Sequence, residues 1–60
     1  MNWNEMKRKV IEMDYEFERS GKRHEIYRHP VKKDIVILER HWSQEVRPGL
    51  MKKILRQIGA

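Results

Sequence analysis

The sequence predicts an α+β domain, an α-β-β-β-α two-layer sandwich in which a three-stranded antiparallel sheet carries two helices on one face. Three observations predict this class. Apolar residues recur at helical spacing near both ends of the chain, they alternate with polar residues in two segments after the first helix, and a β-branched run precedes the second helix. A chain of 60 residues has room for one domain, which we expect to span residues 1–60.

Residues 3–14 are expected to form the first helix. Their apolar side chains recur at steps of three and four residues, which places on one helical face Trp3, Met6, Val10 and Met13. Asn2 or Asn4 can cap the start of this helix, because a short polar side chain there accepts a hydrogen bond from a free backbone N–H.

Two strands are expected next, over residues 15–20 and 24–29, with a turn at Ser20 and Gly21. In the first strand Tyr15 and Phe17 alternate with glutamates, as in a half-buried strand. In the second strand, alternation separates two sets of side chains onto opposite faces, namely His24, Ile26 and Arg28 against Glu25, Tyr27 and His29. Pro30 ends this strand or marks an edge.

Residues 35–38, Ile-Val-Ile-Leu, are expected to form the third strand after a basic connection over 31–34. All four residues are apolar and three are β-branched. We therefore interpret this segment as the central strand of the sheet, with both of its faces covered. A polar loop over 39–49 follows.

Residues 48–58 predict the second helix. Pro48 suits the first helical position, where no backbone N–H is needed, and Gly59 suits a left-handed cap. The apolar stripe comprises Leu50, Met51, Ile54, Leu55 and Ile58, and the polar side carries Lys52, Lys53 and Arg56. This basic row is most simply a solvated face, and phosphate contact is the less favoured interpretation.

The charge of the chain is unevenly distributed. The net charge of +5 arises from residues 21–60, which hold ten Lys or Arg and four Asp or Glu, whereas residues 1–20 hold four and five. Such a basic excess favours an anionic partner, above all nucleic acid. Charge that serves only solubility is the alternative.

Cysteine is absent, which excludes disulfides and thiolate metal sites. The first residues lack the apolar segment of a signal peptide, and no apolar run is long enough to cross a bilayer. We therefore expect a soluble, cytoplasmic protein with no membrane association.

The segment 21–30, GKRHEIYRHP, concentrates basic side chains and two of the three histidines around His24. A second basic pair follows the third strand. Such groups suit phosphate binding, and the candidates are Lys22, Arg23, Arg28, Arg40 and His41. A metal site is not expected, because three scattered histidines without cysteine match no usual zinc spacing.

Three segments of the chain form a recognisable pattern, namely DYEFERSGKRHEIYRHP over 14–30, IVILERH over 35–41 and RPGLMKKILRQIGA over 47–60. They give the chain a clear resemblance to the HicA family. In that order they resemble the family's strand, turn, histidine and aromatic residue, its third strand with a following histidine, and its Pro-Gly helix. HicA proteins are small toxins of bacterial and archaeal toxin–antitoxin modules.

The resemblance implies a double-stranded-RNA-binding-like fold, mRNA cleavage, and an oligomeric complex with a neutralising HicB-type antitoxin. It also implies that His24 is the catalytic histidine. Where the family usually has Gly-Ser-His, this chain has Gly21-Lys22-Arg23-His24. Leu50 stands where threonine is frequent, and Glu39 stands where proline is frequent. None of these differences removes the implied catalytic group.

Cleavage of RNA at a histidine needs neither a metal nor a cofactor, because the 2′-hydroxyl is the nucleophile. The enzyme must remove the hydroxyl proton, protonate the leaving 5′-oxygen and stabilise the phosphate. An imidazole suits either proton transfer, and the cations beside His24 favour the neutral form and hence a general base. The second proton-transfer partner is left open among Tyr27, His29, His41 and water, although alternation puts the first two on the face opposite His24.

Two aromatic residues have competing interpretations. Tyr27 is expected to be structural, whereas Trp42, beside Arg40 and His41, is the better candidate for contact with RNA or an antitoxin. The alternative functions are a module that holds structured RNA without cutting it and a protein-binding adaptor.

Overall fold

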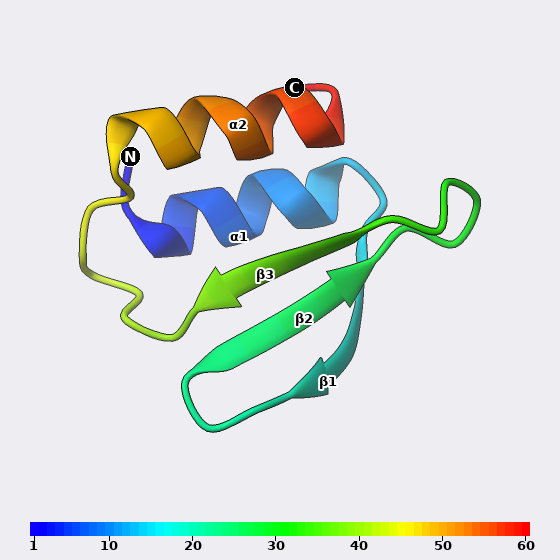
Figure 1. The fold of residues 1–60 in the computed structure, drawn as a ribbon, viewed down its shortest axis with the longest axis horizontal. Coiled ribbons are helices and arrows are strands. Elements are labelled where there is room, and N and C mark those ends of the chain that lie inside the picture. The colour runs from blue at the N-terminus through cyan, green and yellow to red at the C-terminus, as the bar shows by residue number, and fades with distance from the viewer.

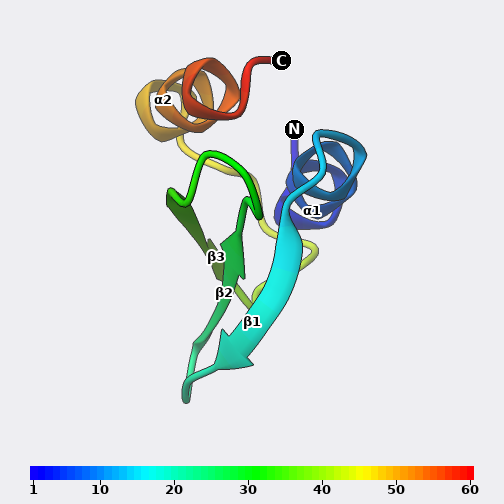
Figure 2. The ribbon, with the colours of Figure 1, turned by 90° about the vertical axis from the view of Figure 1, so that its right-hand side faces the viewer.

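The computed structural model describes all 60 residues and has the predicted order of elements. They are α1 (Trp3–Glu12), β1 (Glu16–Ser20), β2 (His24–Arg28), β3 (Ile35–Glu39) and α2 (Pro48–Ile58), as Figure 1 shows. The strands form one antiparallel sheet, and both helices lie on the same side of it (Figure 2). The predicted two-layer α+β sandwich is confirmed. Neither helix is long and apolar enough to span a membrane.

Both helices have the predicted end signals. Asn2, rather than Asn4, caps α1: its side chain accepts from Glu5 N at 2.9 Å, and Glu5 Oε1 accepts from Asn2 N at 3.1 Å. The helix ends two residues earlier than predicted, because Asp14 adopts a left-handed conformation with φ of 70°. Helix α2 begins at Pro48 and is closed by Gly59, whose φ is 82°.

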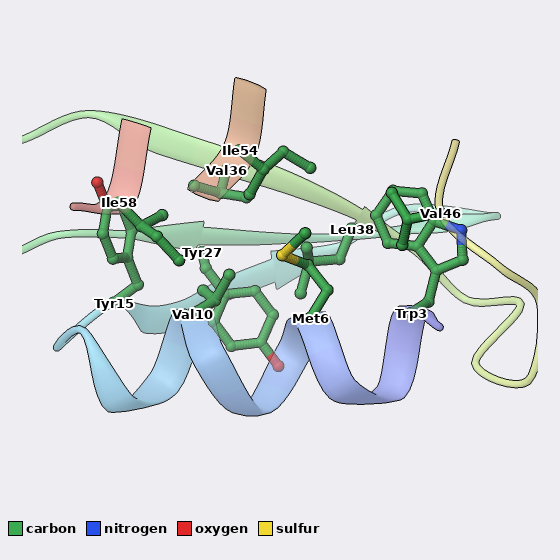
Figure 3. Close-up of a cluster of buried hydrophobic side chains, with 10 residues drawn as sticks. All are labelled: Trp3, Met6, Val10, Tyr15, Tyr27, Val36, Leu38, Val46, Ile54 and Ile58. Atoms are coloured by element: carbon green, nitrogen blue, oxygen red, sulfur yellow. The ribbon is translucent and has the colours of Figure 1, made fainter. Parts of the chain in front are cut away.

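The core lies between the helices and one face of the sheet. Helix α1 contributes Trp3, Met6 and Val10, whose side chains point toward the strands and α2 in Figure 3. The ten buried residues are all apolar or aromatic: Trp3, Met6, Val10, Tyr15, Tyr27, Val36, Leu38, Val46, Ile54 and Ile58. The structural role predicted for Tyr27 is confirmed.

The position predicted for the third strand is wrong. The sheet order is β1-β2-β3, so β2 is central and β3 is an edge strand. Only the helix side of β3 is covered: Val36 and Leu38 are buried, whereas Ile35 and Ile37 are 38% and 51% exposed on the other face. Short turns join the three strands in chain order, and no second layer covers the open face of the sheet.

Strand β1 is less regular than its alternating sequence suggests. Phe17 pairs with Tyr27, but the next pair is Arg19 with Ile26, so Glu18 forms a β-bulge. Phe17 makes an edge-to-face contact with the Tyr27 ring, with centroids 5.7 Å apart, yet it is 55% exposed. Of the two aromatic residues predicted on the buried face, only Tyr15, just before β1, is buried.

A polar network ties the β2–β3 turn to the rest of the molecule. The Tyr15 hydroxyl donates to Asp34 Oδ2 at 2.5 Å, and Gln57 Nε2 of α2 donates to the same oxygen at 3.1 Å. Gln57 Nε2 also donates to Ile35 O at 2.7 Å. Burial and the Asp34 hydrogen bond raise the pKa of Tyr15 to about 12. The hydrogen bonds from Tyr15 and Gln57 lower the pKa of Asp34.

We expect Leu38→Ala to lower the free energy of unfolding by about 2–5 kcal/mol, because it opens a cavity in the small core. The matched variant Ile37→Ala, on the exposed face of the same strand, should change it by only about 0.5 kcal/mol. Urea unfolding of both variants measures the difference. Equal losses would contradict the one-sided burial of β3.

Asp34→Asn should make the free energy of unfolding less dependent on pH in the acidic range. The folded-state pKa of Asp34 is lowered, so its contribution is present above the ordinary value of 3.8 and is lost as the pH falls through the folded pKa. Urea unfolding of both proteins between pH 5 and pH 2 measures this slope. A variant curve parallel to that of the wild type would show that Asp34 is not stabilised by its two donors.

Candidate functional site

His24 is the first residue of β2, at the end of the β1–β2 hairpin that projects away from both helices (Figures 1 and 2). The turn is closed by a hydrogen bond from Gly21 N to His24 O at 2.9 Å. The His24 side chain is exposed and has no hydrogen-bond partner within the chain. Its imidazole is therefore free to meet a ligand.

The pairing of β2 with β3 determines what surrounds His24. Glu39 lies directly opposite it, and Arg40 N donates to Arg23 O at 3.1 Å, which continues the pairing by one residue. By alternation, Arg23 and Arg40 leave the sheet on the other side from His24 and Glu39. We call Lys22, Arg23, His24, Glu39 and Arg40 the sheet-end cluster.

The cations of the sheet-end cluster are available for an anion. Lys22, Arg23 and Arg40 are exposed, and none of them takes part in an ion pair. His41 follows Arg40 directly and is also exposed, with its carbonyl accepting from Gln44 N at 2.9 Å. Four of the five predicted phosphate-binding residues therefore lie at the His24 end of the sheet.

Arg28 is not brought to this cluster. It ends β2, four residues from His24, or about 13 Å along an extended strand. Its guanidinium donates to Glu18 and to Lys33 O, the latter at 3.1 Å. The hydrogen bond from Arg28 lowers the pKa of Glu18, so this cation is already paired with a carboxylate.

The other two proton-transfer candidates have structural roles. His29 Nδ1 accepts from Val31 N at 3.1 Å and from Lys32 N at 3.0 Å, so it shapes the β2–β3 turn. Tyr27 is buried on the helix side, and its hydroxyl donates to Glu25 Oε1 at 3.0 Å. Burial and this bond raise the pKa of Tyr27 to about 12. Of the predicted candidates, His41 and solvent are left.

The Trp42 side chain packs on one side against other residues of the chain. It packs partly buried against the core, and Lys7 Nζ lies 4.7 Å from its ring centroid. Its carbonyl accepts from Asn4 N at 3.0 Å, which joins the loop to the start of α1. Trp42 is therefore an anchor of the loop after β3, with a partly exposed ring beside His41.

Sequence reasoning missed Glu39 as a neighbour of His24. The residue was noted only as a difference from the HicA pattern, whereas the β2–β3 register pairs it with His24. An alignment of the two strands that pairs Tyr27 with Val36 on the buried face also pairs His24 with Glu39, and it would have identified this neighbour. No group of three or more His, Asp or Glu side chains is arranged to hold a metal ion.

The α-β-β-β-α order and the three-stranded antiparallel sheet define a small α+β protein whose fold is like that of double-stranded-RNA-binding domains. The chain belongs to the HicA family: the family model described as the HicA toxin of bacterial toxin–antitoxin matches residues 3–60. It is accordingly the toxin of a toxin–antitoxin system, with an antitoxin as its partner. Neither a curated protein nor a solved structure matched the chain.

The three histidines should differ in reactivity toward diethylpyrocarbonate. His24 and His41 are exposed, whereas His29 is partly buried and its Nδ1 is occupied by two backbone donors. We expect His24 and His41 to be modified first and His29 to lag until the protein unfolds. Peptide mapping by mass spectrometry checks the order. Early modification of His29 would contradict the hydrogen bonds that hold it.

Proposed function

We propose that this toxin is a metal-independent endoribonuclease that cleaves mRNA with His24 as its catalytic residue and thereby inhibits translation. The observation that carries the proposal is the free, exposed imidazole at a strand end where Arg23 and Arg40 are joined through their backbones. Residues 1–60 would form a single catalytic domain, and mRNA as substrate implies a cytoplasmic site of action.

In the proposed reaction His24 removes the proton of an RNA 2′-hydroxyl. The 2′-oxygen attacks the adjacent phosphorus, the bond from phosphorus to the 5′-oxygen breaks, and a 2′,3′-cyclic phosphate is left. The departing 5′-oxygen takes a proton from His41 or from water. Such positioned proton transfer contributes roughly 10²–10⁴-fold to a rate.

The cations of the sheet-end cluster would supply RNA binding. Lys22, Arg23 and Arg40 would contact backbone phosphates, and Arg23 and Arg40, which leave the sheet on the other side from His24, would hold phosphates that flank the one being cleaved. Glu39 adds one carboxylate to this basic surface. Residues directly opposite each other in a sheet have Cβ atoms about 5 Å apart, so Glu39 is within reach to orient the His24 imidazole.

A HicB-type antitoxin is the proposed partner, and neutralisation would follow from coverage of His24 and the cations beside it. Binding to the folded toxin also stabilises it by mass action. This effect matters for a chain with a ten-residue core. The proposed complex is therefore both the inactive and the more stable form of the toxin.

The decisive experiment is cleavage of a long mRNA by the purified toxin in excess EDTA, followed by the same assay with His24→Ala. We expect the wild type to cut and the variant to lose about 10²–10⁴-fold in rate while its RNA affinity stays nearly unchanged. If neither protein cuts although both bind RNA, the protein is an RNA-binding module instead. Equal cutting by both proteins would remove His24 from the mechanism.

Matched variants separate chemistry from binding. The double variant Arg23→Ala, Arg40→Ala should weaken RNA binding and reduce its salt dependence by about two released counterions. Arg8→Ala removes an exposed cation of α1 and should leave both quantities unchanged. A smaller rate for His41→Ala, with unchanged affinity, would assign the second proton transfer to His41 rather than to water.

A further inference from the structure

The two edges of the sheet are protected very differently. Along β1 the bulge at Glu18 interrupts the pairing, and charged residues occupy most positions of the strand. Strand β3 pairs with β2 over five consecutive residues without a bulge, and residues 35–38 are all apolar. Natural sheets usually blunt a free edge with charge, proline or a bulge, because a regular apolar edge recruits another strand.

The free edge of β3 presents unpaired backbone groups. His29 N donates to Asp34 O, and Arg40 N donates to Arg23 O, so Asp34 and Arg40 face β2. Alternation in an antiparallel ladder then turns the N–H and C=O groups of Ile35, Ile37 and Glu39 outward. The Ile35 carbonyl oxygen already accepts a hydrogen bond from Gln57 Nε2. Ile37 therefore offers a free donor and a free acceptor to an added strand.

An apolar groove runs beside this edge, between β3 and α2. Its cavity of about 250 Å³ is lined by Ile35, Val36, Ile37, Leu50, Lys53, Ile54 and Gln57. Ile37 and Leu50 are 51% and 38% exposed. Five of the seven lining residues are hydrophobic, so the groove suits apolar side chains better than sugar or phosphate.

The far rim of the groove is positively charged. Lys53 and Gln57 also line a neighbouring hollow on α2, together with Gly49, Lys52 and Arg56. No Asp or Glu occurs after Glu45, and none of these α2 cations belongs to an ion pair. The groove therefore combines an apolar floor with an unneutralised basic wall.

We infer that the free edge of β3 binds an extended segment of a partner protein that carries apolar and acidic residues, which adds a fourth strand to the sheet. Main-chain hydrogen bonds at Ile37 would give affinity, and the groove with its basic wall would select the side chains. A second copy of the chain fits poorly, since it would bring together two sets of α2 cations at +5 net charge each. The inference is independent of the proposed nuclease activity.

The test is an NMR titration of the full chain with a capped peptide, Ser-Glu-Val-Glu-Val-Glu-Ser, in the absence of RNA. We expect the largest amide shifts at Ile37 and Glu39. A peptide of the same sequence and charge that is N-methylated at all five central residues has no N–H group to donate along either edge, and its affinity should fall by about tenfold or more. Equal binding of both peptides would mean that charge attraction alone holds them to the protein, and it would overturn the inference.

A pair of variants tests the location. Ile37→Lys and Phe17→Lys each place a lysine at a half-exposed apolar site, the first on the free edge and the second on the bulged strand. Ile37→Lys should abolish the shifts and Phe17→Lys should leave them unchanged. Both variants should keep a folded spectrum. Two results would overturn the inference: dimerisation of the free protein through Ile37, or a short RNA duplex moving the Ile37 signal where the peptide does not.

Discussion

The register between β2 and β3 is the constraint on which the site depends. Burial of Tyr27, Val36 and Leu38 against the helices fixes this register, because a slip of β3 by one residue would turn Val36 and Leu38 to solvent while Tyr27 stayed on the buried face. The same register sets His24 opposite Glu39. The arrangement of exposed polar groups at the end of the sheet is thus determined by apolar groups in the core.

Stabilising contacts and unpaired charges lie at opposite ends of the sheet. The Tyr15, Asp34 and Gln57 network joins three parts of the chain at the β2–β3 turn. At the other end, Arg23 and Arg40 are held together with no carboxylate bonded to either one. Like charges so placed oppose folding, and the helix-side core and the polar network offset that repulsion.

Local sequence signals predicted the helices and strands, whereas the order and register of the strands depend on pairing between distant segments and could not be predicted in the same way. Helical spacing and end residues such as Pro48 and Gly59 act within one turn, so both helices could be predicted nearly to the residue. The apolar run 35–38 predicts a strand but carries no information on its neighbours, which is why its edge position was missed. In the same way, spacing grouped the basic residues around His24, but only the register shows that Arg28 lies apart and Glu39 lies opposite.

The unequal edges of the sheet also bear on how many molecules can assemble. A sheet open on both sides can grow without limit, as fibres do, whereas the bulge and charges of β1 close one side here. The sheet can then be extended only at β3, so this chain offers one free edge to a partner. Two copies of the chain can therefore share a sheet only through their β3 edges, and such a pair leaves no free edge for a third copy.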